Sequence, residues 1–196
     1  IGHLVKIQGS TVNVTVGTAK NLPFAPKINN LVAEDCVSIA KSDWDAFETS
    51  WGFRNLDLLM TDDRSTLIHD RYKKLRIQWQ ELTLALQRFE ESNNRTLIEV
   101  FRLQDELIPD VPLNEITLTR NPLYRYGKEK SDDELESLLL ADTMRDFISY
   151  AVGCMFGRYA LEEPGLILAN QGETLQDYLK RVPEPSFPAD EDNVIP

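Results

Sequence analysis

The sequence predicts a mainly α-helical fold with an antiparallel helical hairpin, a long C-terminal core helix and a small N-terminal β remnant. Three observations support this: a heptad seam over residues 68–89, capping boxes at 96–99 and 131–134, and a single strand-like segment at 11–16. The 196 residues are 42% hydrophobic and 27% charged, an ordinary balance for a globular protein. This length allows one domain with a smaller annex.

The N-terminal segment reads as β and loop. Val12, Val14 and Val16 alternate with polar residues, which is the period of a half-buried strand. A lone strand leaves its edges unpaired, and no later segment offers a comparable one. We therefore expect residues 1–29 to be a strand and connector remnant of an upstream domain. Both chain ends look cut, so we expect a piece of a longer protein.

From residue 30 onwards the apolar periods are helical. A first short helix, capped by Asn30, presents a stripe of Leu31, Val32, Cys36 and Ile39. A second short helix, capped by Ser42 and Asp43, carries three large aromatic residues, Trp44, Phe47 and Trp51. Aromatic residues at helical spacing usually lie in a core, so we expect all three to be buried.

The strongest signal is the heptad seam, whose members are Ile68, Tyr72, Leu75, Trp79, Leu82, Leu86 and Phe89. The polar residues 92–95 interrupt it, and the capping box at 96–99 opens a second helix. That helix presents one face made of Leu97, Val100, Phe101, Gln104 and Leu107. We therefore expect an antiparallel hairpin of helices near 66–91 and 95–107.

The capping box at Ser131–Glu134 predicts a long helix near 132–160. The apolar stripe of this helix, over residues 135–159, should form one core with the heptad seam. Gly153 and Gly157 should allow the backbone of another segment to pack closely against the helix. A last short helix is expected over 175–181. We expect residues 30–182 to form a helical C-terminal domain, and residues 183–196, with four prolines and four acids, to be an extended acidic tail.

Composition restricts the function. The net charge of −11 repels nucleic acid, so DNA contact requires a local basic patch. No apolar run is long enough to cross a membrane and no secretory signal is visible, so we expect a cytoplasmic protein. Cys36 and Cys154 match no metal-ligand spacing, and two thiols are favoured over a disulfide. We expect no metal site.

The stretch Asn121-Pro122-Leu123-Tyr124 differs at one position from Asn-Pro-Pro-Tyr, the tetrad that holds a flipped adenine in adenine-N6 methyltransferases. The chemistry needs this tetrad at the end of a parallel strand, beside a cofactor bound over a glycine-rich turn. Neither a strand-Gly-x-Gly-helix unit nor a βαβ alternation occurs here. We therefore predict a structural turn, with no catalytic or cofactor-binding residue in the chain.

The same stretch is a local basic patch, and its candidate DNA-binding residues are Arg120, Tyr124, Arg125, Tyr126 and Lys128. Basic side chains contact phosphates, and tyrosines stack on unpaired bases. The alternative is that these side chains pair with the protein's own surplus of acids.

Several blocks together resemble a known family. They are residues 43–51, 121–127, 148–159 (with the run Gly-Cys-Met-Phe-Gly-Arg-Tyr) and the tail 190–196. In this order they resemble the C-terminal half of the BREX-type adenine-specific DNA methyltransferases, the PglX family of bacterial phage defence. In that family the cofactor-binding motif and the true tetrad lie upstream of the equivalent segment.

The resemblance implies a parent enzyme that transfers a methyl group from S-adenosylmethionine to adenine N6 in DNA. This chain would be a non-catalytic segment that binds no cofactor itself and supports DNA recognition or docks other phage-defence proteins. Residues 1–29 would then be the remnant of a target-recognition or methyltransferase domain. The alternative is a stand-alone helical protein-interaction module with no DNA role.

Overall fold

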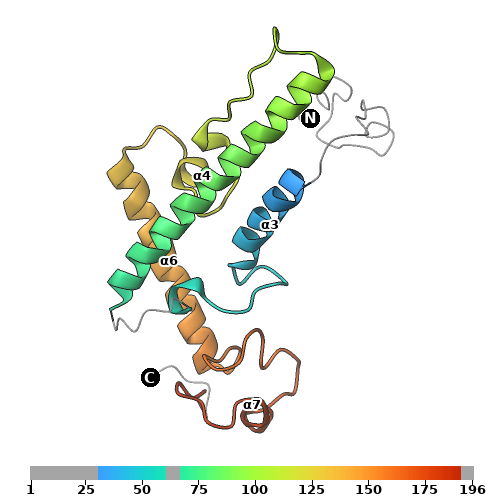
Figure 1. The fold of residues 1–196 in the computed structure, drawn as a ribbon. Helices are drawn as coiled ribbons and strands as arrows, with labels where there is room; N and C mark the ends of the chain where they lie inside the picture. The colour runs from blue at the N-terminus through green and yellow to red at the C-terminus, as the bar shows by residue number, and fades with distance from the viewer. Residues whose placement is uncertain (1–30, 61–66, 191–196) are drawn as a thin grey trace.

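The computed structural model describes residues 31–60 and 67–190. The expected strand remnant at 1–29, the Asn30 cap and the last six residues of the tail lie outside the described residues. Within the described ranges the regular elements are α-helices and short 3-10 helices, without a β-strand (Figure 1). The mainly α-helical fold class is therefore confirmed.

Helix α3 (Leu31–Asp45) is one helix, not the two short helices expected around Ser42 and Asp43. Asp43 does not cap a second helix. Its carboxylate instead accepts hydrogen bonds from the backbone N–H groups of Thr119 and Arg120, at 2.7 and 3.1 Å. Because this carboxylate accepts from a distant loop, it does not cap a new helix, and α3 continues through Asp43. A turn and a 3-10 helix, η1 (Asp57–Leu59), follow.

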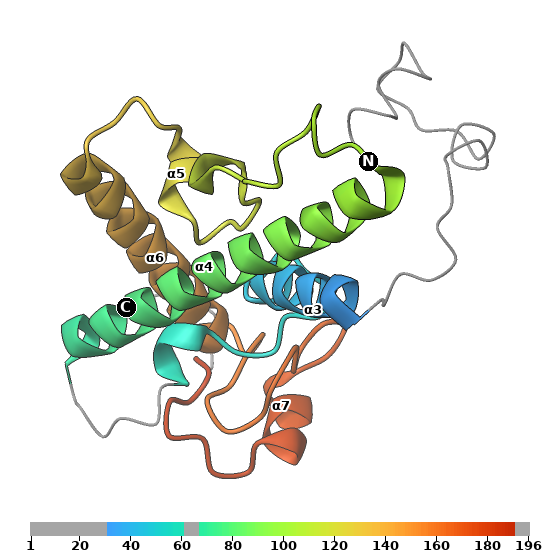
Figure 2. The same cartoon turned by 45° about the horizontal axis from the view of Figure 1, so that its top comes forward.

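The expectation that Trp44 and Trp51 are core residues is wrong. Their side chains are 59% and 106% exposed, whereas Phe47 is half-buried. The reason is the orientation of α3, which lies alongside α4 (Figures 1 and 2). Its inward residues Cys36 and Ile39 pack against a small apolar cluster, so Trp44 lies on another side of the helix.

Helix α4 (Ile68–Phe101) is continuous for 34 residues, so the expected helical hairpin is wrong. The polar residues 92–95 do not break it, and one of them, Asn94, has a hydrogen-bond partner outside the helix. Thr96 Oγ1 donates to the Ser92 carbonyl within the helix, and Asn94 Nδ2 donates to the Pro109 carbonyl of the returning chain. The helix ends at Arg102, which adopts a left-handed conformation (φ 58°), and the returning segment is irregular rather than helical.

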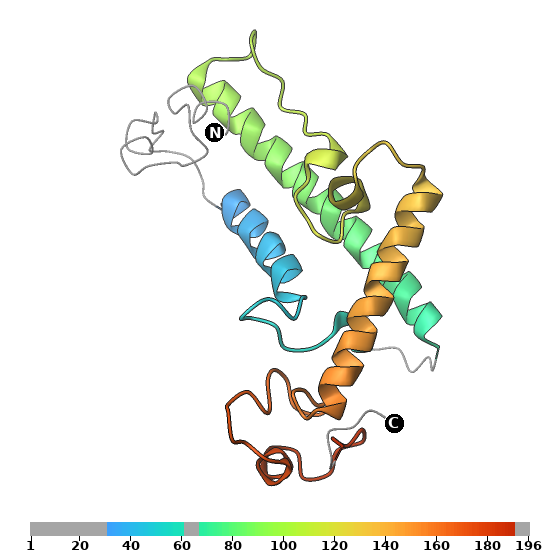
Figure 3. The same ribbon diagram turned by 180° about the vertical axis from the view of Figure 1, so that it is seen from behind.

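Helix α6 (Asp132–Met155) crosses α4, as Figures 2 and 3 show. Its capping box at Ser131 and Glu134 is confirmed. The expected joint core is confirmed in part. One cluster contains Tyr72, Leu75, Trp79, Leu139, Tyr150, Cys154 and Tyr159, whereas the seam residue Leu86 packs in a separate cluster with Ile116 and Leu118. Two seam positions, Ile68 and Leu82, remain 36% and 41% exposed, so the seam is buried only in part.

The expected close approach of a second backbone occurs at Gly157, whose carbonyl accepts from the Leu168 N–H at 3.1 Å. At Gly153 the expectation is wrong, because an aromatic ring lies there. A Cβ at Gly153 would lie 2.6 Å from Cδ2 of Tyr159, and this ring stacks on Tyr150 at 5.0 Å between centroids. Gly157 has a φ of 70° just after α6 ends, which is where a left-handed residue commonly stops a helix. The helix is therefore shorter than the 132–160 expected.

Helix α7 (Leu175–Arg181) has the predicted bounds. It contributes Tyr178 to a second small core, formed with Ala160, Ile167 and Val182. The described part of the tail is non-helical and returns to this core. Ala189 packs against it, and the Asp190 N–H donates to the Met155 carbonyl at 2.8 Å. Cys36 and Cys154 are free thiols, as the sequence predicts.

Candidate functional site

The candidate site is the loop that ends in the one-and-a-half-turn helix α5 (Pro122–Tyr126). It lies close to α6 and to the 3-10 helix η2 (Leu113–Glu115). Figure 2 shows α5 beside the crossing of α4 and α6. Every residue proposed from the sequence for DNA contact falls on this loop or just after it.

Asn121 is the N-cap of α5 and is 2% exposed. Its amide nitrogen donates to the carbonyls of Leu113 and Ile116, at 2.7 and 2.9 Å. Its amide oxygen accepts from the Leu123 N–H at 3.2 Å. Both amide hydrogens and the amide oxygen are thus engaged within the chain, which is the function of a structural turn.

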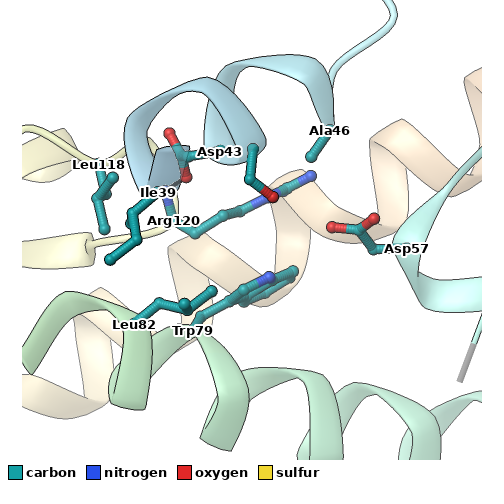
Figure 4. Close-up of a pocket in the computed structure, with 9 residues that line it drawn as sticks. Ile39, Asp43, Ala46, Asp57, Trp79, Leu82, Leu118 and Arg120 are labelled. Atoms are coloured by element: carbon teal, nitrogen blue, oxygen red, sulfur yellow. Dashed lines mark hydrogen bonds between the residues drawn. The ribbon is translucent and has the colours of Figure 1, made fainter. Parts of the chain in front are cut away.

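Arg120 is buried beside this turn, with 4% of its side chain exposed. Its guanidinium carbon lies 4.1 Å from the Phe47 ring centroid and 4.7 Å from that of Trp79. Its Nη1 donates to Oδ2 of Asp146 at 3.1 Å. Figure 4 shows the side chain between α3 and the Trp79 ring of α4. Arg120 therefore stabilises the fold from inside, an arrangement that favours the internal-pairing alternative over DNA contact.

A cavity of about 30 Å³ lies next to Arg120 and is also lined by Asp43 and Asp57 (Figure 4). Burial raises the pKa of the Asp57 carboxyl, while the charge of Arg120 opposes the rise and that of Asp43 adds to it. The Nε of Arg120 is buried without a hydrogen-bond partner among the described residues. This volume is on the scale of a water and far below that of a small-molecule site, so the cavity is too small for a base or a cofactor.

Arg125 and Tyr126 are paired with one carboxylate of α6. Arg125 Nη2 lies 2.7 Å from Oδ2 of Asp142, and the Tyr126 hydroxyl donates to the same oxygen at 2.7 Å. Arg145 donates to the other oxygen of Asp142. Burial and this hydrogen bond raise the pKa of the Tyr126 hydroxyl, which stays protonated as a donor.

Tyr124 and Lys128 are the two candidate residues that reach the surface. Tyr124 is 47% exposed and Lys128 is exposed. The neighbouring Lys130 donates to the Tyr126 carbonyl at 2.9 Å. Internal pairing, the alternative that the sequence left open, thus describes Arg120 and Arg125. DNA contact by Tyr124 and Lys128 stays a prediction.

Asp142 and Asp146, the two acids that pair with Arg125 and Arg120, were not identified from the sequence. Asp142 and Asp146 lie four residues apart on α6, so they share one face of that helix. Two acids at this spacing on an otherwise apolar helix face indicate buried ion pairs, and this pattern could have been recognised in the sequence. Phe47 could not have been found in this way, because its contact with Arg120 joins segments more than seventy residues apart in sequence.

A larger groove of about 390 Å³ lies between α4, α5 and α6. Arg76 on one wall donates from Nε to both oxygens of Glu136 on the other, at 3.0 and 2.8 Å. The hydroxyl of Thr83, which also lines the groove, donates to the Trp79 carbonyl of its own helix. This part of the lining offers no activated nucleophile.

The described ranges contain neither a cluster of metal ligands nor a membrane-spanning helix. No group of three or more His, Cys, Asp or Glu side chains there is placed to hold a metal ion. No described helix is both long enough and apolar enough to cross a membrane.

Comparison with known proteins identifies relatives of this chain, although no family model matches it. It is 31% identical over 199 residues to "Adenine-specific methyltransferase BrxX" of Escherichia coli O9:H4 (strain HS), covering 100% of this chain and 16% of that protein. It is 27% identical over 187 residues to "Adenine-specific methyltransferase PglX" of Lacticaseibacillus casei (strain Zhang), covering 91% and 14%. This segment is related to the PglX family of BREX-type methyltransferases.

The PglX-family resemblance predicted from the sequence blocks is therefore confirmed. The chain spans about a sixth of the length of the curated relatives it matches. The relationship thus concerns a segment, and the activity of the whole relatives does not transfer to it directly.

Proposed function

We propose that this chain is a non-catalytic helical segment of an S-adenosylmethionine-dependent adenine-N6 DNA methyltransferase of bacterial phage defence. The observation that carries the proposal is the alignment of the whole chain with 16% of an adenine-specific methyltransferase. The proposed enzyme acts on DNA, which in bacteria lies in the cytoplasm.

The non-catalytic role is supported by the geometry of the tetrad-like turn. A catalytic asparagine must offer its amide oxygen to the adenine amino group. The oxygen of Asn121 instead accepts the Leu123 N–H, and its nitrogen is held by two carbonyls. The described residues also contain no strand followed by a glycine turn and a helix, so they do not fit S-adenosylmethionine. We assign the cofactor to the rest of the enzyme.

Within that enzyme, we assign the segment a docking role in preference to a primary DNA contact. The chain carries a net charge of −11, and two of the cations in its basic stretch are neutralised by Asp142 and Asp146. A surface of this charge is suited to protein contacts rather than to phosphates. DNA contact remains a second role, restricted to the exposed Tyr124 and Lys128.

Calorimetry with S-adenosylmethionine tests the proposal. The 196-residue chain should give no binding heat, whereas the intact enzyme that contains it should bind the cofactor and methylate adenine in DNA. Micromolar binding by the chain itself would contradict the non-catalytic role. An intact enzyme that binds the cofactor but methylates no adenine would contradict the assignment of the reaction.

A further inference from the structure

Two of the three tryptophans of the chain are presented to solvent around the end of helix α3. Trp51 is 106% exposed and Trp44 is 59% exposed, and Val37, seven residues before Trp44 on the same helical face, is 66% exposed. Tryptophan is the side chain that gains most from burial, and it is over-represented at the centres of protein interfaces. Figures 1 and 3 show the turn that follows α3 at the edge of the molecule.

The tryptophans stand on a rigid corner. Ser50, itself buried, donates from Oγ to Oδ1 of Asp45 at 2.6 Å, and its Oγ accepts the Gly52 N–H at 3.0 Å. Lys41 donates to the other oxygen of Asp45. A Cβ at Gly52 would lie 2.3 Å from Oδ1 of Asp45, so a larger residue there would displace the carboxylate that closes the turn. Trp44 and Trp51 are the chain neighbours of Asp45 and Gly52, so both flank one closed turn.

Such pre-organisation favours binding, because less conformational freedom is lost when a partner docks. The turn is also held to the core, because Ala46 and Phe53, near its two ends, are buried. The corner thus has two features expected of an interface: large apolar side chains at the surface and a backbone that is already fixed.

The charge of the chain indicates what covers the corner. Three of the five acids in residues 31–52 accept hydrogen bonds within the chain, namely Asp43, Asp45 and Glu48. The exposed acids Glu34 and Asp35 lie at the start of α3. The relevant charge is therefore that of the whole chain, whose net value of −11 repels nucleic acid and a second copy of this chain. A protein surface with an apolar recess bordered by Lys and Arg is complementary. Because the aligned segment makes up only 16% of the BrxX relative, most of that polypeptide lies outside it and can supply this surface.

We propose that the Trp44–Trp51 corner is the surface on which another domain of the intact methyltransferase docks, through an apolar recess with a basic rim. The inference rests on the proposed function, because it takes the partner to be the remainder of the same enzyme.

Oxidative footprinting of the intact enzyme tests the inference, with mass spectrometry reporting the oxidation rate at each tryptophan. Docking should slow oxidation of Trp51 about tenfold relative to a free tryptophan amide, because the centre of an interface excludes water. Trp79, which is 5% exposed, serves as the internal standard for a buried ring. Raising the salt concentration should speed oxidation of Trp51 by weakening the charge attraction.

Variants separate docking from incidental shielding. Trp44→Ser in the intact enzyme should raise the oxidation rate of Trp51, since one anchor of the interface is lost. The matched control is Ile108→Ser, which changes a side chain that is 77% exposed in the segment after α4 and should leave that rate unchanged.

Three results would overturn the inference: oxidation of Trp51 at the rate of the free amide, protection that appears only when DNA is added, or protection that disappears on dilution. Adenine methylation is measured on the same sample. Normal methylation with an unprotected Trp51 would refute the docking inference alone, whereas a protected Trp51 without methylation would refute the proposed function alone.

Discussion

Asp146 accepts a hydrogen bond from Nη1 of Arg120 at 3.1 Å, and this pair joins the loop before α5 to helix α6. The guanidinium also lies against the rings of Phe47 and Trp79, so a single side chain connects the turn after α3, helix α4 and helix α6. An arginine in this position determines how the helices sit around the tetrad-like turn.

Arg120→Ala should lower the free energy of unfolding by about 3 kcal/mol, because it leaves Asp146 without its partner and opens space between two rings. We place the loss at the lower end of the range for buried pairs because the Asp146 side chain is 31% exposed. Urea unfolding measures the effect. Arg120→Lys should be intermediate, since lysine keeps the charge but not the planar group. A change of less than about 0.5 kcal/mol, as is usual for a surface residue, would contradict an internal role.

Trp79→Ala should cost about 3–5 kcal/mol, because a buried aromatic ring leaves a cavity and deprives Arg120 of a contact. Trp51→Ala in the same chain is the matched control and should change the stability by less than about 0.5 kcal/mol, since its ring is fully exposed. Thermal and urea unfolding of the two variants give the comparison. Equal losses would mean that Trp51 is packed in solution.

Asn121→Ala should destabilise the chain by about 2 kcal/mol, because the carbonyls of Leu113 and Ile116 and the Leu123 N–H all lose their partner. Tyr124→Ala in the intact enzyme should leave the methyl-transfer rate nearly unchanged. A base-stacking tyrosine behaves in the opposite way, so a folded Tyr124→Ala enzyme that binds DNA but does not methylate it would disprove the structural interpretation of the turn.

Lys128→Ala in the intact enzyme should flatten the dependence of DNA affinity on salt by about one unit of slope if this exposed side chain contacts a phosphate. Site preference should not change, because phosphate contacts carry no base information. Lys180→Ala, at the exposed end of α7, is a control for loss of charge alone. Identical salt slopes for the wild-type and Lys128→Ala enzymes would exclude the contact.

Asp57→Asn should stabilise the chain at neutral pH. Burial raises the pKa of the Asp57 carboxyl in the folded state, so the folded protein holds this proton more tightly than the unfolded chain does. The carboxylate therefore destabilises the fold increasingly as the pH rises from about 4, the pKa in the unfolded chain, through the folded pKa. Urea unfolding at several pH values should show an advantage for the variant at pH 7 that narrows in acid. An advantage that grows in acid would contradict the raised pKa.

Local signals explain which elements were predictable. The capping box at Ser131 and the bounds of α7 depend on residues within one or two helical turns, and both agree with the structure. The burial of Tyr72, Leu75, Trp79 and Leu86 follows from the heptad period of one helix. The interpretation of the Asn121 stretch as a structural turn rested on what the sequence lacks around it, and it stays a prediction.

The sequence by itself determined the helical class, the shared core of α4 and α6, and the relationship to the PglX family. Tertiary contacts decided the rest. Residues 92–95 stay helical, and Asn94 donates a hydrogen bond to the Pro109 carbonyl of the returning chain. Asp43 accepts from Thr119, 76 residues away, and does not cap a second helix. The packing of α3 on α4 turns Trp44 outward, and Asp146 keeps Arg120 inside. Each of these outcomes depends on a partner that is distant in sequence, and periodicity and capping signals carry information only about near neighbours.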